Sequence, residues 1–215
     1  MYERKFTRFI SFMEPDTYLT IKAFSQGLYK EKGSRFISLA WPVTTQEEIK
    51  SILENIRKEY HSARHHCFAW KLGQGSQTYR VNDDGEPSGS AGKPILGQIN
   101  SFQVTNILIV VVRYFGGRLL GVSGLINAYR SAAESALKNS EIAELYVQDY
   151  YELIFPYAVI NDVMKVIKDE EAGQSQQKFE LECRMTINFR TSSRERILNA
   201  LSRIEGLIYR HTETF

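Results

Sequence analysis

The stretch that decides the fold is Ile107-Leu108-Ile109-Val110-Val111-Val112-Arg113-Tyr114-Phe115-Gly116-Gly117-Arg118-Leu119-Leu120-Gly121. An unbroken apolar run that ends at a glycine-rich turn predicts a fully buried strand over 105–113. A helix is expected to begin at about Ser123, because Leu125 and Tyr129 start an apolar pattern of helical spacing. The strand, turn and helix together indicate a mixed α and β protein.

Upstream of this stretch, the pattern predicts further strands and two helices. Strands are expected at 17–24, 35–41, 66–72 and 79–81, where apolar residues alternate or cluster. Thr44 or Thr45 is predicted to cap a helix with Glu48 near its third position. A short helix is expected to start at Pro94, because proline suits a first helical turn.

Beyond residue 140 a second pattern begins. It predicts a strand at 143–155, a helix at 157–169, strands at 174–180 and 182–189, a helix from Ser192 or Ser193 to Gly206, and a strand at 207–212. The order β-α-β-β-α-β is typical of the ferredoxin-like split βαβ arrangement. The predicted fold class is therefore α+β with two domains, residues 1–140 and 141–215.

Composition limits the classes of protein to which the chain can belong. No apolar run approaches the roughly 20 residues that cross a bilayer, and residues 1–6 lack the apolar core of a signal peptide. Cys67 and Cys183 are expected to be reduced, buried thiols. A cytoplasmic protein that does not enter membranes is predicted.

Charge is distributed unevenly along the chain. Residues 1–140 hold 18 Lys and Arg against 12 Asp and Glu, and residues 141–215 hold 9 against 13. The first segment is thus the one suited to a polyanion.

The glycine-rich turn is the first candidate site. A strand, a glycine-rich turn and a helix start place backbone N–H groups at the positive end of a helix, where phosphate binds. The predicted phosphate- or nucleic-acid-binding residues are Arg113, Gly116, Gly117, Arg118, Gly121, Ser123, Arg35, Arg64 and Lys93. Gly116 and Gly121 have the spacing of a nucleotide-hydrolase phosphate loop, but Val122 stands where its lysine belongs. The alternative is that Arg113 braces an acidic loop and the glycines only permit close packing.

That acidic loop is the second candidate site. Asp83, Asp84 and Glu86 lie within four residues, and His66 is expected to face the same region. Such groups can bind a divalent cation or act as general acid and base. They can equally pair with basic residues and fix the surface. A zinc site at the histidines near Cys67 and a Cys67 nucleophile are both disfavoured, because that segment is expected to be an apolar strand. No resident metal and no cofactor are predicted.

Several segments together resemble the YigZ/IMPACT family over essentially the whole chain. They are Val111 to Gly121, Lys32-Gly33-Ser34-Arg35-Phe36, Ala63-Arg64-His65-His66-Cys67, and Asp83-Asp84-Gly85-Glu86-Pro87-Ser88-Gly89-Ser90-Ala91-Gly92-Lys93-Pro94. Gly33 interrupts what is usually a Lys-Ser-Arg-Phe run, and Ser123 replaces a frequent glycine. The resemblance implies an N-terminal βα domain like domain 2 of ribosomal protein S5. It also implies a C-terminal ferredoxin-like domain similar to one in elongation factor G.

The family also suggests a role in translation. Its eukaryotic members influence initiation by competing with an activator of a starvation-responsive kinase, with the help of an additional N-terminal interaction domain. We therefore expect RNA or the ribosome as partner, with a protein of the translation machinery as an alternative. A metal-assisted hydrolase that uses the acidic loop, and an interaction module without nucleic-acid binding, are the rival functions. Enzymatic activity and oligomeric state stay open.

Overall fold

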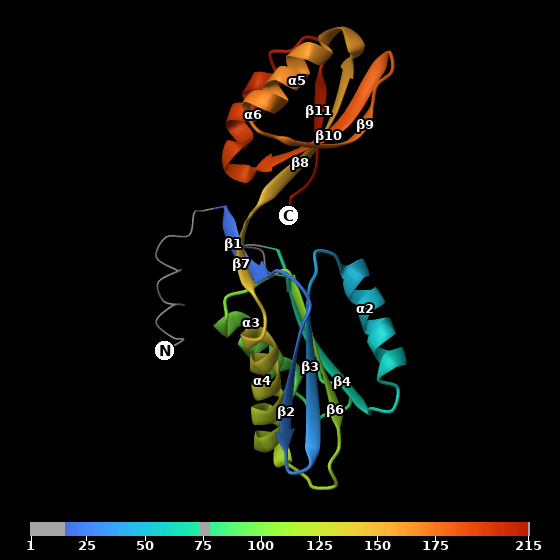
Figure 1. Ribbon diagram of the computed structural model, residues 1–215, viewed down its shortest axis with the longest axis vertical. Coiled ribbons are helices and arrows are strands. Elements are labelled where there is room, and N and C mark those ends of the chain that lie inside the picture. Colours follow the sequence, from blue (N-terminus) through green and yellow to red (C-terminus); the bar gives the residue numbers. More distant parts are fainter. Residues whose placement is uncertain (1–15, 74–77, 215) are drawn as a thin grey trace. The chain divides into compact units, whose positions relative to one another are not determined.

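The computed structural model describes residues 16–73 and 78–214 (Figure 1). The stretch used for the signal-peptide prediction lies outside these residues. The chain divides into two compact units. We call residues 18–145 the N-unit, and residues 16–17 with 146–214 the described part of the C-unit. Helices and strands are present in both units, which confirms a mixed α and β protein. The two named domain folds and the boundary between residues 140 and 141 stay predictions.

The N-unit is built on a five-stranded sheet whose central strand is the apolar run of the sequence. Its strands are β2 (Ser25–Glu31), β3 (Ser34–Pro42), β4 (His65–Leu72), β5 (Thr78–Asn82) and β6 (Ile107–Tyr114), in the order β2-β3-β6-β4-β5. All neighbouring strands are antiparallel. Because β6 has a partner on each edge and helices over both faces, Ile107 to Val112 are completely buried. The predicted strand is therefore the centre of the unit.

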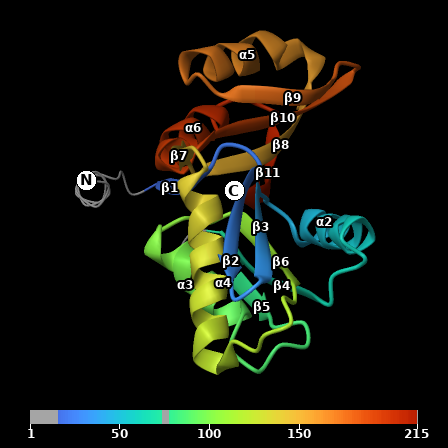
Figure 2. The same cartoon turned by 60° about the horizontal axis from the view of Figure 1, so that its bottom comes forward.

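Helices cover both faces of this sheet (Figure 2). One face carries α2 (Gln46–Glu59), and the other carries α3 (Gly92–Ser101) and α4 (Gly121–Lys138). Thr45 caps α2 in a complete capping box with Glu48, as predicted. The helix α4 begins at Gly121, two residues before the expected start.

One strand of the N-unit was not predicted. The apolar pattern predicts a strand at 17–24, whereas β1 (Thr17–Ile21) ends earlier and β2 follows it. The segment Ser25-Gln26-Gly27 resembles a turn because it is small and polar. Gly27 is required there since a Cβ would lie 2.5 Å from the backbone nitrogen of Ala136 in α4. Close helix packing, which leaves no local sequence signal, is the reason for the error.

The predicted strand at 143–155 is also wrong in its extent. It is two strands, β7 (Ile142–Tyr146) and β8 (Gln148–Pro156), which belong to different sheets. Strand β7 pairs with β1, and β8 lies inside the C-unit sheet. Between them, the N–H of Val147 donates to the carbonyl of Asp16 at 2.6 Å. The chain leaves one sheet at this residue and enters the other.

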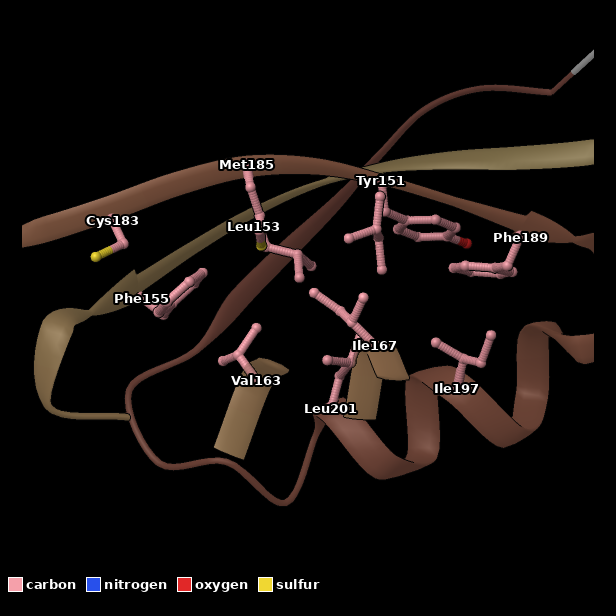
Figure 3. Close-up of a cluster of buried hydrophobic side chains, with 11 residues drawn as sticks. Tyr151, Leu153, Phe155, Val163, Ile167, Cys183, Met185, Phe189, Ile197 and Leu201 are labelled. Carbon is pink, nitrogen blue, oxygen red and sulfur yellow. The ribbon is translucent and has the colours of Figure 1, made fainter. Parts of the chain in front are cut away.

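The C-unit has the predicted element order. It comprises β8, α5 (Ile160–Asp169), β9 (Gly173–Lys178), β10 (Glu182–Arg190), α6 (Arg194–Leu201) and β11 (Ile208–Thr214), and its antiparallel sheet has the order β11-β8-β10-β9. Figure 3 shows its core, in which side chains of β8 and β10 meet those of α5 and α6. Short 3₁₀ turns at 157–159 and 191–193 delay both helix starts. The helix α6 ends at Leu201, before the predicted Gly206, and Ser193 forms no side-chain cap.

Two further predictions concern the cysteines and the membrane. Cys67 and Cys183 are free and buried, as expected. Within residues 16–73 and 78–214, no helix is long and apolar enough to cross a membrane.

Candidate functional site

An open groove of about 830 Å³ lies at the end of the N-unit sheet where β6 finishes and β4 begins. It is lined by Ser62, Ala63, Arg64, His65, Gly85, Glu86, Pro87, Arg113, Tyr114, Phe115, Leu119, Leu120, Gly121, Val122 and Leu125. The acidic loop and the glycine-rich turn, which are separate in sequence, therefore contribute to the same groove.

The N-terminus of α4 opens into this groove without a cap. Among the described residues, no side chain caps the helix, and its first turn holds no acidic residue. The helix α2 differs, because Thr45 and Glu48 satisfy its first N–H groups and Glu47 adds negative charge there. An uncapped helix start presents unsatisfied N–H donors and partial positive charge. The α4 start is thus available for an anion.

Arg113 and Glu86 form the floor of the groove, and Tyr129 joins them in a buried network. Nη1 of Arg113 and the hydroxyl of Tyr129 both donate to Oε1 of Glu86, at 2.6 and 2.8 Å. The side chains of Arg113 and Glu86 are 7% and 4% exposed. Arg113 thus braces the acidic loop, which was the structural alternative for this residue.

Arg113 nevertheless retains an unused donor. Its Nε is buried and finds no hydrogen-bond partner within the described part of the chain. A buried donor without a partner costs about 1–3 kcal/mol, so such groups are rare in folded proteins. Because Arg113 lines the groove, this unpartnered donor lies just beneath the groove surface.

Asp83 accepts hydrogen bonds from the start of α3. Its carboxylate accepts hydrogen bonds from the backbone N–H groups of Gly89, Ala91 and Gly92, at 2.8, 3.0 and 2.8 Å. Burial acts to raise the pKa of Asp83, but these three bonds and the charge of Lys93 outweigh it and hold the pKa below its usual value. Asp83 therefore caps a helix from outside that helix.

Asp84 holds the loop to α2 and β4. Its two oxygens accept from Nη2 of Arg57 at 2.8 Å and from the backbone N–H of His66 at 2.7 Å. Burial acts to raise the pKa of Asp84, and these bonds outweigh it, so the pKa is lowered. His66 is 5% exposed, and its Nε2 lies 3.1 Å from the carbonyl of Tyr60. A carbonyl can only accept, so Nε2 carries the proton and donates.

Cys67 contacts the network of Arg113, Glu86 and Tyr129. Its Sγ is 3.3 Å from the hydroxyl of Tyr129, and the residue is completely buried. Burial raises the pKa of both the Cys67 thiol and the Tyr129 phenol well above their usual values. Both groups are therefore neutral, and a thiolate nucleophile at Cys67 is disfavoured.

The glycines of the turn have two different roles. A Cβ on Gly116 would lie 1.9 Å from the carbonyl carbon of Gly33, so the turn packs directly against the β2–β3 hairpin. Gly33 itself has φ +83° and Lys32 has φ +45°, as a two-residue hairpin turn requires. Gly117 and Gly121 have positive φ, and apart from chain neighbours and the backbone of α4, no described atom lies within 4 Å of a Cβ placed on either. These two glycines shape the turn and leave the space around it open.

The groove unites only part of the predicted phosphate-binding set. Arg64, Arg113 and Gly121 line it, and Arg64 is exposed. Gly116, Gly117, Arg118 and Ser123 belong to the same turn and helix start. The guanidinium of Arg35 lies 5.1 Å from the ring centroid of Tyr114, which lines the groove. Lys93 lies on α3, with its side chain beside Gly89.

Two features of the site were not predicted from the sequence. Tyr129 was assigned only to the helix core, although its hydroxyl completes the Glu86 network. The apolar side chains of the turn and of the α4 start, Phe115, Leu119 and Val122, were not predicted to be exposed or to line the site. The signal for them was present, because three large apolar residues in a glycine-rich turn lack an obvious place in a core.

The described residues hold no group of three or more His, Cys, Asp and Glu side chains that could hold a metal. Each carboxylate of the acidic loop instead has the protein partners given above.

Part of the N-unit matches a known protein family. The Impact N-terminal domain model matches residues 32–137, which include most of the N-unit. The Escherichia coli protein named IMPACT family member YigZ is 46% identical over 109 residues, 50% of this chain and 53% of the relative. The chain thus spans about half the length of the curated bacterial relatives it matches.

Two solved structures extend the comparison. One, described as a hypothetical protein, is 28% identical with a TM-score of 0.73 and covers 93% of this chain and 99% of its own. The other, described as the two-domain translational regulator Yih1, is 25% identical with a TM-score of 0.38 and covers 56% of this chain and 48% of its own. From the matched domain and the curated relatives, the chain belongs to the IMPACT family.

Proposed function

We propose that this chain is a cytoplasmic regulator of translation that binds RNA or the ribosome, with the phosphate backbone held in the N-unit groove. The observation that carries the proposal is the uncapped start of α4, which opens beside the unused donor of Arg113. Helix N-termini with free N–H groups are common sites for phosphate.

The charges around the groove support an anionic ligand. Arg64 lines the groove and is exposed, and Arg118 is exposed on the adjoining turn. Glu86, the acidic residue in the lining, is paired with Arg113 and so adds little free negative charge. Exposed arginines can bind phosphate with two parallel hydrogen bonds.

Membership of the IMPACT family supports translation as the process, because eukaryotic members of that family influence initiation. A protein of the translation machinery is the alternative partner, which the same regulatory role would equally allow. Phosphate binding at the groove favours RNA as the direct contact.

The burial of Arg113 makes it unsuitable as the residue that tests the site. Replacing Arg113 would disturb the fold, so the test uses Arg64→Ala with Arg118→Ala, both of which are exposed. The matched control is Arg130→Ala with Lys138→Ala, which removes the same charge from α4. Lys138 lies about 26 Å along the helix from Gly121, at 1.5 Å per residue.

Binding is measured by co-sedimentation with ribosomes and by fluorescence anisotropy with total RNA fragments at about 50 and 150 mM salt. We expect salt-sensitive binding that the Arg64/Arg118 variant loses and the control keeps. For single-stranded RNA, the loss of two phosphate contacts reduces the magnitude of the negative slope of log K against log salt by about 1.4. Equal binding by the two variants would remove the groove as the site, and no binding by the wild type would refute RNA association.

A further inference from the structure

We infer that the groove takes an unpaired nucleotide of single-stranded RNA, with the phosphate at the start of α4 and the base against Phe115. This inference rests on the proposed function and adds the class of RNA. A bound duplex would use the phosphate contacts alone. An unpaired nucleotide would use the apolar surface beside them as well.

The apolar surface comprises the turn between β6 and α4 together with the first residues of α4. The exposed fractions of Phe115, Leu119 and Val122 are 55%, 85% and 54%. All three line the groove, next to the uncapped helix start. Contiguous exposed apolar side chains with polar neighbours mark binding surfaces. The ligand must therefore carry an apolar face close to a negative charge.

A nucleotide has this combination. Its base offers a flat π face, and its phosphate lies a few bonds away from it. The guanidinium of Arg113 is 5.6 Å from the ring centroid of Phe115, so the ring is already supported by a buried cation. The groove volume of about 830 Å³ falls in the range of pockets that enclose a small molecule.

The same features disfavour a duplex. Bases inside an A-form helix are stacked on each other, and their faces are not available to a side chain. Proteins that bind single strands combine a basic groove with aromatic side chains on which bases stack. The N-unit groove has the exposed Arg64 and Phe115 in these roles. Its positive charge distinguishes it from an apolar groove made for a protein segment.

The experiment compares two probes and five variants of the full chain, which are three at Phe115, one control and the Arg64/Arg118 variant. Fluorescence anisotropy is measured at about 50 mM salt with a labelled 12-nucleotide oligouridine and with a blunt 12-base-pair RNA duplex. Phe115→Ala removes the ring, Phe115→Leu keeps the apolar volume without the ring, and Phe115→Tyr keeps the ring. The control is Tyr79→Ala, which removes a 58% exposed aromatic side chain from β5, outside the groove.

We expect the wild type to bind the oligouridine at least 10-fold more tightly than the duplex. Phe115→Ala and Phe115→Leu should raise the Kd for oligouridine by about 5- to 150-fold, the value of one base–aromatic stack. Phe115→Tyr and Tyr79→Ala should bind as the wild type does. Tryptophan fluorescence of each variant confirms that the N-unit is folded.

The other outcomes separate this inference from the proposed function. If both probes bind equally and only the Arg64/Arg118 variant is weakened, the groove holds phosphate alone and the inference is wrong. A preference for the single strand that survives Phe115→Ala also overturns it. If neither probe binds, the inference is wrong, and the proposed function then depends on the ribosome co-sedimentation alone.

Discussion

Replacing Glu86 by glutamine leaves the guanidinium of Arg113 buried without its counter-ion. The two side chains are 4% and 7% exposed, and they are joined at 2.6 Å. Breaking a buried ion pair by removing one partner costs about 3–5 kcal/mol, because the remaining charge is not solvated. We expect Glu86→Gln and Arg113→Met each to lower the free energy of unfolding of the N-unit by about this amount.

The double variant, Glu86→Gln with Arg113→Met, measures the coupling free energy between the two side chains. The glutamine introduced at position 86 would still accept a hydrogen bond from the hydroxyl of Tyr129. A methionine at position 113 fills much of the volume of the arginine side chain. No charge is then left in the network, so the double variant should be more stable than the sum of the single effects implies. We expect a coupling free energy of at least about 2 kcal/mol, within the range for residues in contact.

Urea denaturation followed by tryptophan fluorescence measures these effects in the full chain. Trp41 and Trp70 are the two tryptophans of the sequence, and both lie in the N-unit. Trp70 is 5% exposed within the core cluster under α2, so its emission changes when this unit unfolds. Single effects that add within about 0.5 kcal/mol would show that the pair is not coupled and would refute this account of the groove floor.

Three smaller predictions use the same assay. Gly116→Ala should destabilise the N-unit by more than about 3 kcal/mol, because the added Cβ would clash with Gly33. Gly117→Ala should cost only about 1–2 kcal/mol, because alanine is strained at the positive φ of this position. Equal costs for the two variants would contradict the packing role of Gly116. Thr45→Ala should cost about 1 kcal/mol by removing the α2 cap, and Thr45→Ser should restore it. The pKa of Asp84 is lowered in the folded state, so its stabilisation is present above the unfolded pKa of about 3.9 and is lost as pH falls further. Asp84→Asn should therefore flatten the loss of stability below about pH 4, and an unchanged acid titration would contradict this.

Local patterns were sufficient for much of the fold. The β6 strand was identified by its apolar run, and the α2 start by Thr45 and Glu48, because each depends on residues close in sequence. Strand β2 was not predicted because Gly27 is required by the close packing of α4 against it, and α4 lies more than 100 residues away in sequence at this contact. The break at Val147 was missed for a similar reason, because it is defined by a bond to Asp16.

The site was predictable in its segments but not in its geometry. The glycine-rich turn and the acidic loop were both identified, yet nothing in the sequence states that they line one groove. Arg113 looks the same in sequence whether it is a free phosphate ligand or the partner of Glu86, 27 residues away. The exposure of Phe115 is likewise a property of the folded chain.

The pairing of β1 with β7 has a practical consequence for dissecting the molecule. These strands come from opposite ends of the N-unit sequence, so the unit is complete only when a fragment includes both. A recombinant fragment that stops at residue 140 would lack β7 and leave the edge of β1 open to intermolecular pairing, which favours aggregation. A fragment from Asp16 to Tyr146 keeps both strands and is the better starting point for crystallisation or NMR of the groove.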